Sequence, residues 1–442
     1  MSTSKQLTDA DREFTGQMLR GADGERAVGG ELAESARQRL DTIGIPGTKD
    51  EEWRFVRLRP LTAMDFVPAA EVAGEVTEAM VDSWSFPESR GTRLVFVNGS
   101  FAPEYSETEG FSDEIRVGSL AEPGDDAEAV SEHLGGPGER FSEDYFSNLN
   151  HAGFRDGAYL IVPSDTAIDG VVHLLHLSTE SSEAYVTQPR NLVVAGRGSK
   201  VSMVEDYGGP AGGTYFNNAF TEISVGESAH VGHVKVQGES TDAFHIGRTA
   251  VDLADASTYN SKTVAYGAKF SRFDVRANGD GEEIDCTLDG LAVLNGDQES
   301  DTHSVMDHRK PNAGSHQLHK MILDDRAHAV FNGKIFVQQH AQKIDAYQLN
   351  RSLLLSKAAK VNTKPQLEIF ADDVSCTHGA TIGQLEQEQM FYLRARGLTE
   401  QEARELLIYA FAAEILETIP VESVRDRLAE TIAHKTRFSE RE

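Results

Sequence analysis

A long stretch, from about residue 92 to residue 381, constrains the fold most, because short β-type runs alternate there with turns rich in Gly, Asn and Asp. Runs of roughly four to eight residues bounded by such turns are typical of strands. No convincing helical periodicity of about 10–12 residues interrupts them, which argues against strand–helix–strand units. We therefore predict that the middle of the chain is nearly all β. Examples are the runs 94–97, 159–162, 192–194, 231–236, 334–338 and 367–370.

A loose repeat of short alternating strands occurs within this stretch. Its strands begin at Val330, Ile344 and Val361, which lie 14 and 17 residues apart. This spacing is too short for propeller blades and suits strands stacked around the coils of a solenoid. It indicates a β-helix, although a β-sandwich has similar strand spacing, so the pattern alone leaves both folds open.

Helical signals precede the β stretch. Residues 31–40 show apolar residues at helical spacing, and the segment 45–48 then breaks the helix at Pro and Gly. The charged run 49–54 surrounds Trp53, and we interpret it as a helix start anchored by a buried tryptophan. The chain is thus expected to comprise a helical N-terminal region (1–90), a β core (91–382) and a C-terminal helical region (383–442).

Helical periodicity returns after Gly383. Gly397 is suited to end one helix in the left-handed conformation, and Thr399 with Glu402 has the spacing of a capping box at the start of the next. That helix is expected to run to Pro420 with Arg404 and Glu405 facing outward, and a last helix to cover about 421–434. Its apolar stripe is predicted to be Leu406, Leu407, Ala410, Phe411, Ile415 and Leu416.

The charge balance excludes several partners. Asp and Glu total 71 against 42 Lys and Arg, a net charge of −29, which repels phosphate backbones and anionic membranes. We therefore expect neither nucleic acid nor membrane as a partner. The acidity fits either a salt-rich cytoplasm or a basic partner protein.

Export and a disulfide framework are also not expected. Residues 1–6 lack the apolar segment of a signal peptide, and no run of about 18 apolar residues occurs anywhere. The two cysteines, Cys286 and Cys376, are too few and too far apart for a disulfide framework. No Cys-x-x-Cys pair offers a closed zinc site. A cytoplasmic protein that does not span a membrane is predicted.

The segment 368–381 carries the most informative chemistry. Cys376 and His378 are two residues apart, so in a strand both side chains point to the same face. A thiolate and an imidazole on one face suit iron or zinc, or a Cys–His nucleophile pair. Free cysteine is commonly buried, however, so by spacing alone a structural role is favoured.

Two other groups of residues are candidates for chemistry. His316 and His319 are three apart and cannot share a strand face, and no His-Glu-x-x-His motif is present, so solvated or carboxylate-paired histidines are favoured over a metal site. The acidic doublets at 324–325 and 372–373 resemble a glycosidase pair but fit turn positions better. The histidines of this cluster are His303, His308, His316, His319, His328 and His340.

Nucleotide-binding and hydrolase motifs are absent from the sequence. It contains no Gly-x-Ser-x-Gly, no Walker loop and no Gly-x-Gly-x-x-Gly that opens a helix. Any use of ATP or a dinucleotide is therefore expected to belong to another chain.

Four segments carry a family resemblance: 350–356 (NRSLLLS), 363–369 (TKPQLEI), 372–379 (DDVSCTHG) and 391–397 (FYLRARG). Together they resemble the SufB/SufD family of iron–sulfur cluster assembly proteins, and specifically its SufD branch. The resemblance covers most of the chain and is strongest after about residue 300. Weaker agreement extends upstream through 307–311, 330–335, 94–104 and 51–53.

The resemblance implies a fold and a function. It implies a right-handed parallel β-helix flanked by helical regions, and a scaffold subunit that is not an enzyme. It further implies a complex with SufB and two SufC ATPase subunits, in which a nascent iron–sulfur cluster forms before transfer, with reduced flavin as a further cofactor of the complex. SufC is expected on the C-terminal helices, and the isolated chain as a possible homodimer.

In the family, a cysteine and a histidine near the C-terminal strand edge of SufD are associated with the SufB–SufD interface. They match Cys376 and His378, which the resemblance therefore implies as ligands of iron or nascent cluster. SufB carries a further cysteine one strand earlier, where this chain has Asn350. Because four-iron clusters usually take four thiolates, the missing ligands are expected from the partner.

A rival interpretation is a β-helix carbohydrate-active enzyme, which would use clustered carboxylates along a groove of the solenoid. That class would be expected to carry a secretion signal and exposed aromatic platforms for sugars. Neither is evident, and the whole chain contains only two tryptophans.

Overall fold

The computed structural model describes residues 7–436 except residues 23, 25, 73, 75 and 211. Residues 1–6, which bear on the export prediction, lie outside the described residues. Within the described part, no helix is long and apolar enough to cross a membrane.

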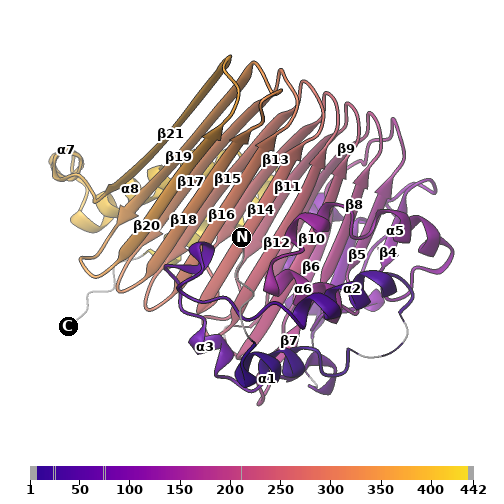
Figure 1. The fold of residues 1–442 in the computed structure, drawn as a ribbon. Coiled ribbons are helices and arrows are strands. Elements are labelled where there is room, and N and C mark those ends of the chain that lie inside the picture. Colours follow the sequence, from indigo (N-terminus) through magenta and orange to yellow (C-terminus); the bar gives the residue numbers. More distant parts are fainter. Residues whose placement is uncertain are drawn as a thin grey trace.

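A parallel β-helix forms the centre of the molecule (Figure 1). From β8 onward, successive strands alternate between two sheets, and from β10 onward each strand pairs in parallel with the strand two places earlier in the chain. Sheet A holds β8 (Arg190–Ala195), β10 (Tyr215–Val225), β12 (Phe244–Leu253), β14 (Phe270–Gly279), β16 (Glu299–His308), β18 (His328–Val337) and β20 (Lys360–Ile369). Sheet B holds β9 (Lys200–Gly208), β11 (His230–Gln237), β13 (Thr258–Ala265), β15 (Asp285–Leu294), β17 (Gly314–Leu323), β19 (Ile344–Leu354) and β21 (Val374–Gly383).

This architecture confirms the predicted mainly β fold with a parallel β-helix, and it decides against the sandwich. The three repeat segments form the starts of β18, β19 and β20, which are consecutive strands of the solenoid. The doublet at 324–325 lies in the turn between β17 and β18, where Asp325 has a φ of 52°, and 372–373 lie in the bend before β21. Both acidic doublets are thus turn residues, because short polar side chains tolerate such conformations.

Earlier strands complete the first coils. Sheet A continues through β5 to β4 and includes β1 and β7, whereas sheet B continues through β6 and β2 to β3. These strands are β1 (Val67–Pro68), β2 (Arg93–Val97), β3 (Ser100–Phe101), β4 (Arg116–Ser119), β5 (Ala158–Val162), β6 (Val172–Leu177) and β7 (Tyr185–Thr187).

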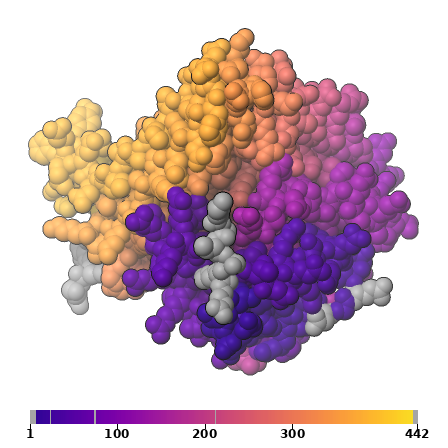
Figure 2. All heavy atoms as spheres, in the orientation of Figure 1, coloured from indigo at the N-terminus to yellow at the C-terminus, as the bar shows by residue number. Residues whose placement is uncertain are grey.

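The C-terminal helices and most of the N-terminal region cover opposite faces of the β-helix, whereas α4 (Glu78–Trp84) packs on β2 and β6 of sheet B. N-terminal residues such as Phe14, Leu40 and Trp53 pack on outward residues of sheet A, including Phe216 and Phe244, and Figure 2 shows the N-terminal residues spread across this side. The helices of the region include α1 (Asp9–Met18), α2 (Gly30–Leu40), η1 (Glu51–Trp53), α3 (Arg59–Thr62) and α4 (Glu78–Trp84). Trp53 is buried at the end of a short 3-10 helix, as predicted.

The C-terminal helices are α7 (Gln387–Ala395), α8 (Glu400–Leu416) and α9 (Glu422–Lys435). Helices α8 and α9 pack on the outer face of sheet B, where Ile408 and Leu428 meet residues such as Val234. The predicted capping box of Thr399 with Glu402 is present, and Gly397 has a φ of 101°, so these helix boundaries are confirmed.

Three details of the C-terminal prediction were wrong. Leu406 is 45% exposed and Ala410 is exposed, so neither belongs to the buried stripe, which instead includes Ala403, Ile408 and Ala412. The side chain of Arg404 is only 16% exposed and pairs with Asp324, so it does not face outward. The tertiary contact with the β17–β18 turn decides its position.

Two short helices inside the predicted β stretch were missed. They are α5 (Ala127–His133) and α6 (Tyr145–Gly153), which precede the uninterrupted strands. All nine residues of α6 are buried. With seven and nine residues, both helices are shorter than the stretch of about 10–12 residues over which helical periodicity is recognised.

Candidate functional site

The last coil of the β-helix has open edges. Strand β20 pairs only with β18 and β21 only with β19 among the described strands. Unpaired edges present free backbone donors and acceptors, and natural proteins usually cover or block them. Exposed apolar side chains of this end are Tyr347, Ile369, Phe370 and Ile382. The end of the solenoid therefore has the properties of an unoccupied interface.

Cys376 and His378 lie on β21, opposite Ala346 and Gln348 of β19. Ala346 and Gln348 are buried, and Cys376 packs against the core cluster that contains Ala346. Because side chains of a strand alternate between faces, His378 shares the inward face with Cys376. The structure thus brings both predicted residues to the inner face of the last, open coil.

The Cys376 side chain is half-buried at this mouth. Burial, together with the nearby charge of Asp345, raises the pKa of the Cys376 thiol above its ordinary value. The thiol is therefore protonated at neutral pH in the isolated chain, and binding a metal ion would have to displace the proton. A nearby cation, or a metal ion supplied by a partner, would instead favour the deprotonated thiolate of Cys376.

The His378 side chain is exposed and makes no hydrogen bond or ion pair with any residue that the structure describes. Both ring nitrogens are therefore available to an external ligand. A neutral imidazole next to a thiol is a donor set that suits iron or zinc.

The second cysteine lies deeper in the same column. Cys286 opposes Ser315, Ser315 opposes Ala346, and Ala346 opposes Cys376 on successive strands of sheet B. Three strand spacings of about 4.8 Å separate the cysteines by roughly 14 Å, and burial raises the pKa of Cys286 strongly. Cys286 is a core residue that cannot share a ligand with Cys376.

Asn350, which stands where SufB was inferred to have a cysteine, is fully buried on β19. Its Nδ2 donates to the carbonyl oxygen of His319 at 3.1 Å. It therefore serves the packing of the lumen and offers no thiolate to the last coil.

The six histidines of the second candidate group do not converge. His316 is exposed on β17, whereas His319 faces the lumen and His303 lies on the outer face of sheet A. Across the described residues, no group of three or more His, Cys, Asp or Glu side chains could hold a metal ion. By itself, the described chain presents only an incomplete donor set at the open end.

Glu52 makes contacts on sheet A that the sequence did not predict, because the run 49–54 indicated only an anchor around Trp53. Glu52 accepts from Lys334 Nζ and from Asn332 Nδ2, and contacts His303 Nδ1 at 3.2 Å. Burial raises the pKa of Glu52, but His303 and Lys334 outweigh it and hold the pKa well below its ordinary value.

The same acidic doublet reaches the last coil of the solenoid. Glu51, next to Glu52, pairs with Lys364 of the edge strand β20. The N-terminal region is thereby tied to the coil that carries the open edge. In the sequence, the only indication of these ion pairs was the acidic doublet itself, because its basic partners lie far along the chain.

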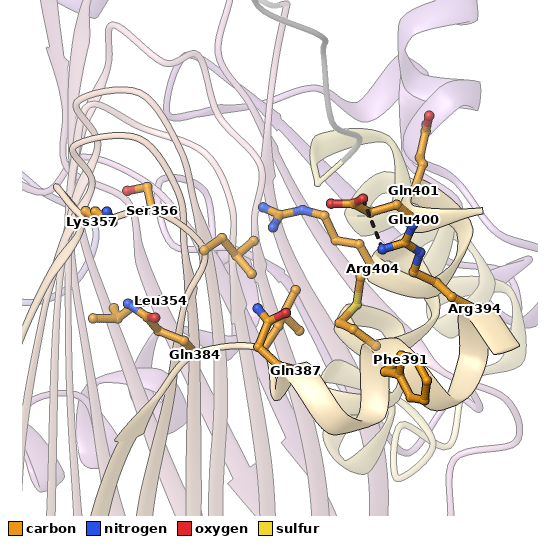
Figure 3. A pocket seen from close by; sticks show the side chains of 13 residues that line it. Leu354, Ser356, Lys357, Gln384, Gln387, Phe391, Arg394, Glu400, Gln401 and Arg404 are labelled. Atoms are coloured by element: carbon orange, nitrogen blue, oxygen red, sulfur yellow. Dashed lines mark ion pairs between the residues drawn. The ribbon is translucent and has the colours of Figure 1, made fainter. Parts of the chain in front are cut away.

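A second exposed surface surrounds α7. None of the nine residues of α7, all of them described, is buried, and Phe391 and Tyr392 are 75% and 55% exposed. A cavity of about 680 Å³ separates α7 and α8 from the end of β19. Figure 3 shows Lys357, Arg394 and Arg404 around it, with the ion pair between Arg394 and Glu400.

Comparison with known proteins identifies the family of the chain. Residues 177–411 match the family model described as SUF system FeS cluster assembly, SufBD core domain, and residues 22–174 match the SufBD protein N-terminal region. The chain belongs to the SufB/SufD family. It is a SufD-like subunit of SUF iron–sulfur cluster assembly, as the resemblance implied, and these matches give no support to the carbohydrate-active alternative.

Similar proteins come from distant organisms. A SufBD family protein of Synechocystis is 40% identical over 91% of this chain and 90% of its own length. The iron–sulfur cluster assembly protein SufD of Escherichia coli is 31% identical over 91% of this chain and 92% of its own length. A chloroplastic protein of Arabidopsis thaliana, ABCI7, is 31% identical over 90% of this chain and 84% of its own length.

Proposed function

We propose that this chain is a non-catalytic scaffold that contributes Cys376 and His378 to a site for iron or nascent cluster, completed by a SufB-type subunit. The observation that carries the proposal is the position of both donors on the inner face of an open last coil. Two donors are too few for a cluster, since four-iron clusters usually take four protein ligands. A partner that pairs with the open edges would add its own donors at the same place.

The iron content of the assembled complex tests this proposal. In a complex co-expressed with SufB and SufC, Cys376→Ser and His378→Ala should each weaken iron retention by roughly tenfold or more, since changing even a group that only hydrogen-bonds to a ligand costs about 10–100-fold in metal affinity. His316→Ala is the matched control, because His316 is exposed on a different face. Iron and sulfide are measured on the purified complex, with its subunit composition checked by size exclusion.

Two results would contradict the proposal. One is an unchanged iron and sulfide content in both variants despite normal assembly. The other is an isolated wild-type chain, as monomer or homodimer, that holds about one metal ion per chain through chelator treatment, because the scaffold is proposed to need its partner. The second result would direct attention back to the histidines of residues 303–340.

We also propose that the SufC ATPase docks on α7 and the adjoining part of α8. An exposed aromatic pair on a helix without buried residues fits an interface anchor, since aromatic residues are enriched at interface hot spots. The cavity beside it adds the basic side chains Lys357 and Arg394, which would suit an acidic or polar segment of the partner. Docking here would leave the open end of the β-helix free for SufB.

Phe391→Asp should weaken ATPase binding by about 30-fold or more, which corresponds to a hot-spot loss of at least about 2 kcal/mol. Helix α7 contributes nothing to the buried core, so the melting temperature should stay within error of the wild type. Affinity is measured by titrating SufC onto the purified chain. Glu388→Gln, a conservative change on the same helix, is the control. If a folded Phe391→Asp variant bound SufC with wild-type affinity, the docking site would not be on α7.

A further inference from the structure

The lumen of the β-helix contains a polar column as well as apolar packing. On successive strands of sheet B, Glu205, Lys235, Thr263, Gly290 and His319 stand opposite one another in register. Four of these positions carry polar side chains, and the fifth carries none. Gly290 therefore leaves a gap in the column between Thr263 and His319.

The ring of His319 lies against this gap. A Cβ atom placed on Gly290 would come within 2.7 Å of His319 Nδ1, so the imidazole occupies part of the space that a side chain would have taken. The remaining space forms two small cavities of about 20 Å³ and 10 Å³. Both are lined by His319, Thr263, Thr302 and Phe273.

The ring of His319 faces the larger cavity without a hydrogen-bond partner. His319 is 3% exposed, and neither of its ring nitrogens has a hydrogen-bond partner among the described residues. Leaving a buried polar atom unpaired costs about 1–3 kcal/mol, so the arrangement requires a further hydrogen-bonding group.

We propose that the larger cavity binds one ordered water molecule against the ring of His319. Its volume of about 20 Å³ exceeds the roughly 10–15 Å³ that one water needs. Its wall offers the hydroxyls of Thr263 and Thr302 in addition to the unpaired ring of His319, which satisfies the need for 2–4 polar partners. The smaller cavity is at the limit of this volume and receives no assignment.

The bound water supplies a hydrogen-bond partner at the glycine gap. Burial lowers the pKa of His319 to about 3, so its imidazole is neutral and has one donor and one acceptor nitrogen, and the water can bond to one of them. The same molecule can bond to the hydroxyl of Thr302, which lines the same cavity. One ring nitrogen of His319 thereby gains a partner on β17, two strand spacings below β21.

A crystal structure of the full chain that resolves ordered solvent tests the proposal directly. A density peak is expected within about 2.7–3.2 Å of a ring nitrogen of His319. In solution, oxygen-17 relaxation dispersion counts long-lived internal waters, and His319→Phe should lower the count by about one. Thr302→Val, a smaller change in the same wall, should shorten the residence time of that water if the phenylalanine variant does not fold.

Ser300→Ala is the matched control, because Ser300 also faces the lumen but already accepts from Ser271 at 3.0 Å. Its count of long-lived waters should equal that of the wild type. An empty cavity in the wild-type crystal structure would overturn the proposal. So would an unchanged count and residence time in folded His319→Phe and Thr302→Val variants.

Discussion

Replacement of Glu205 by glutamine is expected to lower the free energy of unfolding by about 3–5 kcal/mol, the usual cost of removing one partner from a buried ion pair. Glu205 is fully buried in the lumen. It pairs with Lys235 at 3.1 Å and with His233 at 2.9 Å, and it accepts from Tyr207 and Thr221 at 2.6 and 2.8 Å. Glutamine keeps the shape but leaves Lys235 without its counter-charge.

Denaturant titration of the full chain measures this loss. Glu227→Gln, an exposed turn residue, should change stability by no more than about 0.5 kcal/mol. The double variant Glu205→Gln with Lys235→Met should recover part of the loss, because the uncompensated buried charge is gone. A loss below about 1 kcal/mol in Glu205→Gln would show that the pair is not held as described.

The same variant should change the response of stability to pH. Burial raises the pKa of Glu205, but Lys235 and His233 outweigh it and hold the pKa well below its ordinary value of 4.5. A depressed folded-state pKa adds stability that is fully present above the unfolded-state pKa and disappears as pH falls through the folded-state pKa. Glu205→Gln should therefore flatten the loss of stability below about pH 4.5.

The pair of variants Phe370→Asp and Ile382→Asp is expected to abolish stable association with the SufB-type subunit, with each alone weakening it by about 30-fold or more. Phe370 and Ile382 are 60% and 47% exposed at the open end of the β-helix. A carboxylate there would be desolvated by any partner that covers the edge. Neither change disturbs a buried residue, so the isolated chain should stay folded.

Affinity is measured by titrating the SufB-type subunit onto the purified variants. Phe391→Asp, which replaces an exposed aromatic residue on α7, is the control and should retain SufB binding while it loses ATPase binding. The reverse pattern is expected for Phe370→Asp. If Phe370→Asp and Ile382→Asp assembled with SufB at wild-type affinity, the open end would not be the shared interface, and the placement of the cluster site there would fail with it.

Local interactions explain what could be predicted from the sequence. Short strands between Gly, Asn and Asp turns, the capping box of Thr399 with Glu402, and the left-handed Gly397 depend on neighbours within a few residues. Each of these was found where it was expected. The shared face of Cys376 and His378 likewise follows from the two-residue period of any strand.

Features that depend on distant partners could not be predicted in the same way. Helix α6 is nine residues long and buried on every side by neighbouring elements, so it is too short for helical periodicity to identify it. Arg404 turns inward because Asp324, 80 residues earlier, accepts from it. Glu51 and Glu52 meet Lys364 and Lys334 only because the N-terminal region folds across sheet A.

The sequence by itself determined a nearly all-β middle, helical ends, and a thiol and an imidazole on one face of a strand. Only the tertiary structure decided which face that is and that it lies at an unpaired edge. The reason is physical: residues about 30 positions apart become neighbours by stacking in register, as Ala346 and Cys376 do. A strand in the middle of the stack would have buried the same two side chains, whereas β21 is the last strand of its sheet and leaves them open to a partner.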